Sequence, residues 1–184
     1  MNDRAGMNDE IQTQIGYSKA KKENMGLRGL VVAELFGPDG KLKGRFETDN
    51  LVTDIGDQYF ASRAYTNYDT TTGLKLGTAT TAASKSGAGS FIATADYVSG
   101  SAKAPDESSP KVGASANIVQ VIRTWAAGEG TNATINRVMW GDNTTDAGEA
   151  DATHTWATAV FAGQIVKGAA DTLKVTWNIT FLGA

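Results

Sequence analysis

The clearest pattern along the chain is an alternation of apolar and polar residues close to its C-terminus. From Leu173 to Phe181 every second residue is large and apolar, and Lys, Thr and Asn stand between them. Side chains of a β-strand point alternately to its two faces, so this period of two predicts a strand with one buried face. Because the strand ends almost at the last residue, we expect this terminus to be held in a sheet.

A β-hairpin is predicted at the start of the regular pattern. Residues 29–36 are rich in Val and Leu, and the following Gly37-Pro38-Asp39-Gly40 has the residue types that a turn requires. Residues 41–48 then alternate between an apolar face and a basic one that carries Lys41, Lys43 and Arg45. We interpret the basic face as one that keeps the edge of a sheet in water.

A helix is predicted at about residues 51–65. Its apolar residues recur at spacings of three and four and form one stripe, made of Leu51, Val52, Ile55, Tyr59 and Phe60. Asp49, Asn50 or Thr53 can cap its first turn. We expect the stripe to pack on a sheet, with the aromatic residues in the core.

The remaining pattern consists of short β-like runs separated by small and polar residues. These runs cover residues 74–78, 91–98, 118–125, 135–140 and 154–161. The glycine-rich turn at 128–132 predicts that 118–140 form a second hairpin, and 99–116 and 141–151 are predicted as polar loops. Residues 27–184 are therefore expected to be a mainly β, single domain: an antiparallel β-sandwich or jelly-roll-like fold with one packed α-helix.

Composition excludes several kinds of chemistry. The 184 residues include no cysteine and one histidine, so a disulfide framework, a cysteine nucleophile, a zinc–thiolate site and a His-pair metal site are absent. A net charge of −3 provides no electrostatic footprint for nucleic acid or an anionic membrane. We expect a binding or structural protein without catalytic residues, cofactor or metal, and without nucleic-acid or membrane partners.

Residues 1–26 differ from the rest and are predicted to be an extended N-terminal docking arm. The segment is polar and cannot bury enough surface to order itself without a partner. Its candidate partner-binding residues are a few apolar side chains followed by a basic group: Ile11, Ile15, Tyr17, Lys19, Lys21 and Lys22. It has no apolar stretch of the kind that a secretory signal needs, so synthesis and retention in a cytoplasm are expected.

Three features leave an alternative open. His154 could serve as a base but has the context of a surface residue at the start of a strand. The acidic loop 141–151 could bind calcium or host glycan. Its carboxylates could also act in pairs on a glycosidase substrate, and they belong to Asp142, Asp146, Glu149 and Asp151. The tryptophans could form a sugar platform, but core packing is the favoured interpretation for Trp125, Trp140, Trp156 and Trp177.

Four blocks of sequence, in order, resemble small virion proteins of tailed bacteriophages. The family's V-x-L-x-D-x-x-G hairpin, which leads into an NLVTNAG segment and a helix, is similar to Glu34-Leu35, Gly40 and Asn50-Leu51-Val52-Thr53-Asp54-Ile55-Gly56 here. Its LGTGTTA block resembles Leu76-Gly77-Thr78-Ala79-Thr80-Thr81-Ala82, where Ala79 replaces the second glycine. A glycine-bearing turn at 128–135 and a closing strand at 171–181 complete the match, which spans about residues 30–183.

The resemblance implies a non-enzymatic structural protein located in the virion and made in the bacterial cytoplasm of the host. The expected function is a capsid decoration or cement protein that stabilises the assembled shell. Its expected partners are the major capsid protein, other virion proteins and further copies of itself as a homo-oligomer. The alternative is a tail, collar or fibre component that contacts host glycans.

Overall fold

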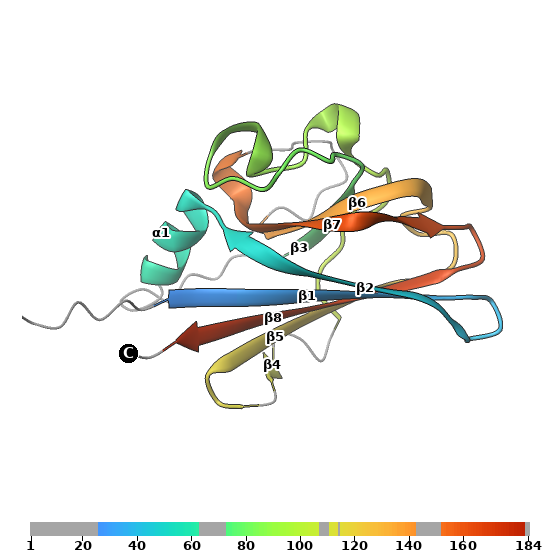
Figure 1. Cartoon of the computed structure of the whole chain (residues 1–184), viewed down its shortest axis with the longest axis horizontal. Helices are drawn as coiled ribbons and strands as arrows, with labels where there is room; N and C mark the ends of the chain where they lie inside the picture. The colour runs from blue at the N-terminus through green and yellow to red at the C-terminus, as the bar shows by residue number, and fades with distance from the viewer. Residues whose placement is uncertain (1–25, 63–72, 107–110, 114, 143–151, 183–184) are drawn as a thin grey trace, which may run out of the picture.

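The computed structural model describes residues 26–62, 73–106, 111–113, 115–142 and 152–182 (Figure 1). Its strands and its α-helix, in chain order, are β1 (Gly26–Phe36), β2 (Leu42–Val52), α1 (Asp54–Ser62), β3 (Gly73–Gly77), β4 (Lys111–Val112), β5 (Ile118–Trp125), β6 (Asn132–Gly141), β7 (Thr155–Lys167) and β8 (Thr172–Leu182). Short 3-10 turns lie at Gly87–Gly89, Thr94–Asp96 and Ala152–His154. Of the predicted arm, only Gly26 is described, and it begins β1.

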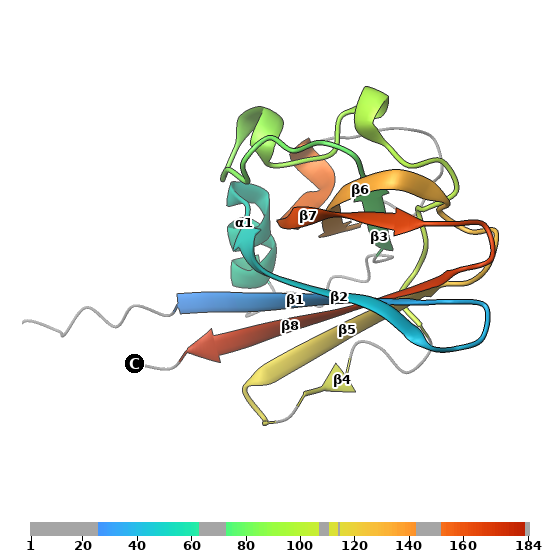
Figure 2. The same ribbon diagram turned by 45° about the vertical axis from the view of Figure 1, so that its right-hand side comes forward.

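All neighbouring strands are antiparallel and form one eight-stranded sheet in the order β3-β6-β7-β2-β1-β8-β5-β4. The sheet curls into two layers, with β3, β6 and β7 facing β1, β8 and β5, and α1 lies at one end between them (Figure 2). β2 belongs to both layers, because its residues 42–49 pair with β1 whereas residues 50–52 pair with β7. The expected mainly β, antiparallel fold with one helix is confirmed, and its two layers come from one continuous sheet.

The core between the layers is built from the alternating residues of the central strands. In β8 the inward residues are Leu173, Val175, Trp177 and Ile179, and none of them is exposed to solvent. They lie opposite Leu35, Ala33, Val31 and Gly29 of β1. The C-terminal strand predicted from the period of two is therefore confirmed, and it occupies the middle of its layer.

One predicted hairpin is confirmed and the other is wrong. β1 and β2 form the first hairpin around the Gly37-Pro38-Asp39-Gly40 turn, in which Gly40 has a positive φ of 74°. β5 and β6 do not pair: β5 lies between β8 and β4, and β6 lies between β3 and β7. The turn between them carries the chain from one layer to the other. Each strand has an apolar face that fits either layer, so periodicity alone could not reveal the crossing.

The helix begins later than predicted. Leu51 and Val52 pair with β7 as the end of β2, and Thr53 is the residue that caps α1. The buried Thr53 hydroxyl accepts a hydrogen bond of 3.0 Å from the N–H of Gly56 and contacts the carbonyl oxygens of Thr155 and Trp156 on β7. The two apolar residues matched a helical stripe in the sequence, but strand pairing satisfies their backbone groups instead. Residues 63–65 of the predicted helix lie outside the described part.

The helix packs very closely against the start of β7. A Cβ atom on Gly56 would lie 1.9 Å from the carbonyl oxygen of Trp156, so this position admits no side chain. The ring of Tyr59 stacks on that of Trp156 with their centroids 3.6 Å apart, and Phe60 lies 5.9 Å from Trp140. The helix aromatics thus pack against the core, as predicted, and both are half-buried.

The strand predicted at 91–98 is wrong. This segment contains the 3-10 turn Thr94–Asp96 and makes one isolated bridge, from Tyr97 to Gly77 of β3. Its buried anchors are Ile92 and Val98, whereas Ala93 and Ala95 are exposed. The alternation that suggested a strand depended on alanines, which contribute little apolar area and so do not fix a face.

We predict that Gly56→Ala lowers the free energy of unfolding by about 1–3 kcal/mol, because the new methyl group would overlap a backbone oxygen that cannot move without disturbing β7. Urea unfolding followed by tryptophan fluorescence measures the change. Gly163→Ala is the matched control, since its Cβ would meet Phe46 at an ordinary 3.8 Å. Equal stability of the two variants would contradict the close helix–strand contact.

Candidate interaction surfaces

The six predicted binding residues, Ile11, Ile15, Tyr17, Lys19, Lys21 and Lys22, lie outside the described residues. The structure does define where their segment joins the fold. Gly26 pairs with Leu182, so the arm meets the domain at the end of β1, beside the end of the C-terminal strand. Both termini of the described chain thus lie at the same end of one layer, the end near α1 (Figure 1).

The residues considered for catalysis or metal binding do not assemble into a site in the described part of the chain. His154 is half-buried in a 3-10 turn, where its ring nitrogen lies 3.1 Å from the Thr153 hydroxyl. Of the acidic loop, Asp142 is described, whereas Asp146, Glu149 and Asp151 lie outside the described residues. Among the described side chains no group of three His, Asp or Glu residues could hold a metal ion.

The tryptophans are core residues, as predicted. Trp125, Trp140, Trp156 and Trp177 are between 0% and 4% exposed. Trp140 packs edge-on against Trp156 at 5.3 Å and lies 6.2 Å from Trp177. A sugar platform needs an exposed ring face, and none of these four rings offers one.

A shallow groove lies where three turns meet, at the end of the sheet away from α1. It has a volume of about 590 Å³ and is lined by apolar and small residues from the 37–40, 126–130 and 168–171 turns and their flanks: Phe36, Gly37, Pro38, Gly40, Ala127, Ala170 and Thr172. No charged side chain lines it, so the groove offers van der Waals contact and no acid–base chemistry.

An ion pair and a lysine hydrogen bond beside this groove hold its turns together. Lys43 donates to Asp171 at 2.8 Å, and Lys167 donates to the carbonyl oxygen of Ala126 at 2.9 Å. The hydrogen bond from Lys43, together with one from the N–H of Gly168, lowers the pKa of Asp171. Burial lowers the pKa of Lys167, against the opposing effect of Asp171 and Glu129. The three turns therefore form a fixed surface.

The segment 97–106 closes one side of the curled sheet like a strap. On β3 it exchanges two hydrogen bonds between Lys103 and Leu74, at 2.9 and 3.1 Å. On β5 the N–H of Asp106 donates to Ile122 at 2.8 Å, and the Asp106 carboxylate accepts two bonds from Thr124. The part of the loop predicted at 99–116 that is described here thus covers the edges of both layers, which keeps those edges from pairing with another chain.

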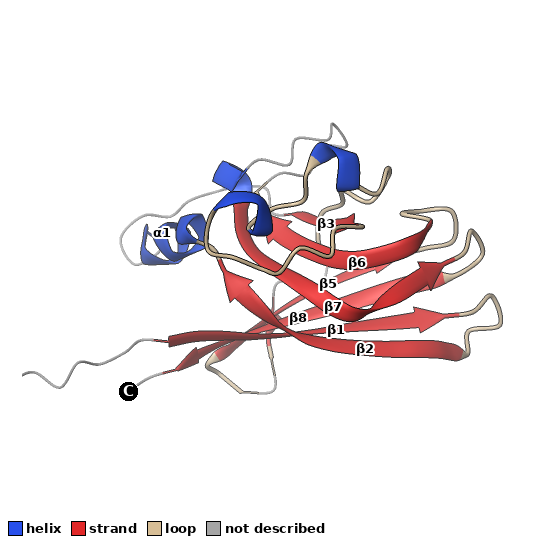
Figure 3. Ribbon diagram, turned by 45° about the horizontal axis from the view of Figure 1, so that its top comes forward, coloured by secondary structure: helices blue, strands red, loops and turns tan. Residues whose placement is uncertain are grey.

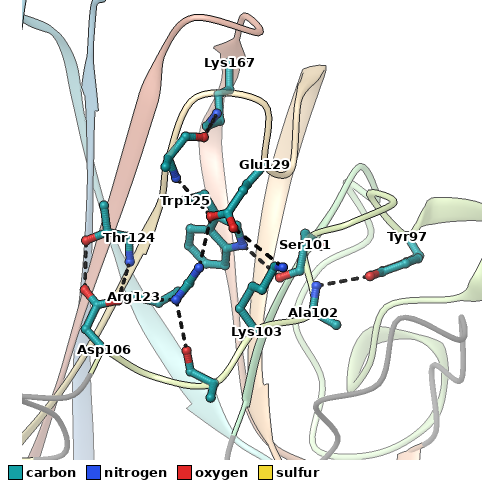
Figure 4. Close-up of polar contacts among 12 residues, drawn as sticks. Tyr97, Ser101, Ala102, Lys103, Asp106, Arg123, Thr124, Trp125, Glu129 and Lys167 are labelled. Atoms are coloured by element: carbon teal, nitrogen blue, oxygen red, sulfur yellow. Dashed lines mark hydrogen bonds and ion pairs between the residues drawn. The ribbon is translucent and has the colours of Figure 1, made fainter.

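A polar network anchors the strap (Figure 4). Arg123 lies 3.0 Å from Glu129 and 3.5 Å from Asp106, and Lys103 lies 3.6 Å from Glu129. Partial burial acts to raise the pKa of Glu129, but the hydrogen bond from the N–H of Ala126 and the charges of Arg123 and Lys103 outweigh it, so that pKa is lowered. Trp125 donates its indole N–H to the carbonyl oxygen of Ser101 at 2.8 Å. The network is structural, since every group in it contacts the strap or its neighbouring turn.

A buried arginine fixes the loop that lies over the outer face of β6 and β7 (Figure 3). Arg137 on β6 is 0% exposed, and its guanidinium donates to the carbonyl oxygens of Gly89, Phe91 and Thr81. Burial lowers the pKa of Arg137, and Asp96 opposes this change. The sequence carried no signal for this role, because an arginine in an alternating strand resembles an exposed residue.

Comparisons with known proteins add no relative. No family model, curated protein or solved structure matches the chain. Within the described residues, no helix is both long enough and apolar enough to cross a membrane.

We predict that Glu129→Gln destabilises the protein at neutral pH by about 0.5–1 kcal/mol, the range of partly exposed ion pairs. Since the pKa of Glu129 is lowered on folding, its carboxylate stabilises the fold above the unfolded-state value of about 4.3 and ceases to do so as the pH falls through the folded-state value. Urea unfolding between pH 7 and pH 3 should show the difference from wild type shrinking toward acid. A pH-independent difference would contradict the ionic role.

We predict that Arg137→Met frees the loop above β6 by removing the donor to three of its carbonyl oxygens. Limited proteolysis with trypsin should then cleave after Lys85, which lies in that loop, at least about tenfold faster, equivalent to about 1.4 kcal/mol of local stability. Lys41→Met, at an exposed position beside the first hairpin turn, is the control. An unchanged cleavage rate in Arg137→Met would show that other contacts hold the loop.

Proposed function

We propose that this protein is a non-enzymatic structural component of a tailed-phage virion, and within that class a capsid decoration protein that stabilises the assembled shell. The support is the ordered resemblance of four sequence blocks, together with the structural demands at the positions that carry it. The observation that weighs most is the junction at Thr53 and Gly56, both of which belong to the Asn-Leu-Val-Thr-Asp-Ile-Gly block.

Residues of this block perform roles that few other residue types could perform. Thr53 caps α1 and binds two carbonyl oxygens of β7, and Gly56 lets the helix touch the chain at Trp156. The side chain of Asn50 requires a glycine opposite it, because a Cβ atom on Gly29 would lie 1.6 Å from the amide oxygen of Asn50. A motif that meets such specific requirements is less readily produced by chance than one on an exposed loop, which favours a shared fold with the virion proteins.

The remaining blocks also lie on framework elements. The Leu-Gly-Thr block covers the end of β3 and its exit, where a Cβ atom on Gly77 would approach Ile92 to 2.7 Å. The closing block is β8, the strand between β1 and β5. The resemblance therefore concerns the architecture of the domain, while residues 1–25 stand outside it as the segment that would attach the domain to its partner.

A decoration protein acts through mass action. It binds the assembled lattice and not the dissociated subunits, so each bound copy shifts the assembly equilibrium toward the shell. Weak contacts suffice when many copies bind side by side. The strapped edges and the rigid turn surface suit such a role. The covered edges do not pair with strands of another chain, and the turns present a defined surface.

The alternative within the structural class is a tail, collar or fibre component. Its glycan contacts would have to come from surfaces other than the tryptophans, since those rings are buried. Counting copies by quantitative mass spectrometry of purified virions separates the two locations: a decoration protein is present in hundreds of copies and a tail or collar component in few.

The test of the docking arm is a truncation that removes residues 1–25 and leaves β1 complete. We predict that the truncated protein folds with an unchanged unfolding midpoint but no longer binds particles that lack the wild-type protein. Co-sedimentation with those particles measures the binding.

A side-chain variant separates the arm's contacts from its length. Ile11→Ser, Ile15→Ser and Tyr17→Ser combined should weaken particle binding at full chain length, whereas Gln12→Ser and Gln14→Ser combined serve as the matched control. Decoration by the truncated protein at wild-type occupancy would refute the docking-arm proposal.

A further inference from the structure

The outer face of the layer formed by β2, β1, β8 and β5 is uncovered by any described segment. Its middle is apolar and small: Val32 and Ile122 are 8% and 9% exposed and lie outside the core cluster, and Thr176 lies between them. Leu30, beside this group on β1, is 41% exposed. Leu30 is therefore the exposed large apolar residue of this face, around which contact with another surface can form.

Most charges on this face are neutralised within the chain. Arg45 lies 2.5 Å from Glu47 and 3.5 Å from Glu34, and Lys174 lies 3.9 Å from Glu34. Two charges differ: in the part of the chain that the structure describes, Arg28 and Asp49 have neither an ion-pair nor a side-chain hydrogen-bond partner, although both are exposed. They carry opposite charges and both neighbour Leu30.

We propose that this face binds the same face of a second copy, with Leu30 against Leu30 and Arg28 of each copy paired with Asp49 of the other. Asp49 stands directly opposite Leu30 in the β1–β2 register, about 5 Å away, and Arg28 lies two residues along β1, about 7 Å away. Consider a two-fold axis that lies in the plane of the interface and passes through Leu30. If it runs midway between the direction to Arg28 and the direction to Asp49, it exchanges the positions of these two residues. Contacts that repeat in this way are those of an isologous dimer.

The same axis determines how the two faces cross. Because Arg28 and Asp49 lie nearly at right angles as seen from Leu30, the strands of the two copies cross at about 90°, one of the two usual geometries for packed sheets. The two-fold rotation places Thr176 of one copy near Thr176 of the other, and Val32 of one copy near Asn178 of the other. The amide oxygen of Asn178 already accepts a hydrogen bond from the amide of Gln120 at 2.9 Å. Among these described positions, the rotation brings no like charges together.

The contact is small, so a weak and concentration-dependent dimer is expected. Exposed ion pairs add little energy and mainly select the partner's orientation. This inference is independent of the virion proposal: it concerns the isolated full-length protein, and either proposal can fail while the other stands.

Sedimentation equilibrium of the full chain tests it. Wild type should show a monomer–dimer equilibrium that weakens as salt rises from about 0.05 to 0.5 M. Leu30→Asp should lower the association constant at least about tenfold. Arg28→Glu and Asp49→Arg should each lower it alone, and the two combined should restore it, because the double variant exchanges the charges and recreates the pair.

Leu42→Asp is the matched control, because Leu42 is 52% exposed and lies at the hairpin end of β2, away from Leu30. It should leave the association constant unchanged, and equal urea-unfolding midpoints would show that each variant is folded. A monomer at every concentration, a dimer insensitive to Leu30→Asp, or no recovery in the double variant would overturn the proposal. So would a dimer that is lost on removing residues 1–25 but persists in Leu30→Asp, since the arm would then form the contact.

Discussion

The fold depends on one strand that serves two layers. β2 starts beside β1, ends beside β7 and leads straight into the helix, so the relative position of the layers is set where Thr53 bonds to the start of β7. At that point the buried hydroxyl of Thr53, the missing side chain of Gly56 and the ring of Tyr59 stacked on Trp156 lie within the first two turns of the helix. These contacts join α1, β2 and β7, and the tryptophan core fills the space that they define.

The two sides of the curled sheet are closed in different ways. One side is closed by the strap at 97–106, whose backbone bonds to β3 and whose Asp106 bonds to β5. In the part of the chain that the structure describes, the other side is closed where β2 pairs with β7. Both solutions limit open strand edges, so the surfaces left for recognition are turns and sheet faces. This division agrees with a protein that binds others without extending its sheet.

The sequence predicted the positions of strands along the chain better than it predicted which strands pair. The alternation around Trp177 identified β8 because one buried face repeats over nine residues, and the turn at Pro38 identified the first hairpin. Pairing of β5 with β8 could not be foreseen, since the apolar face of Ile118–Trp125 fits several partners equally well. Arg137 was missed because its acceptors are carbonyl oxygens distant in sequence, and those leave no trace in residue types. Of the predicted binding residues, none lies in the described part, so they stay a prediction.

Arg137 has a consequence for how this protein can change over evolutionary time. Its guanidinium recognises backbone oxygens, which every amino acid carries, so the fastening places no demand on the side chains at positions 81 and 91. A loop secured in this way can diversify its outward residues through many substitutions while its path stays the same. The layer above β6 is therefore a region where new surface chemistry can arise at little cost to the fold.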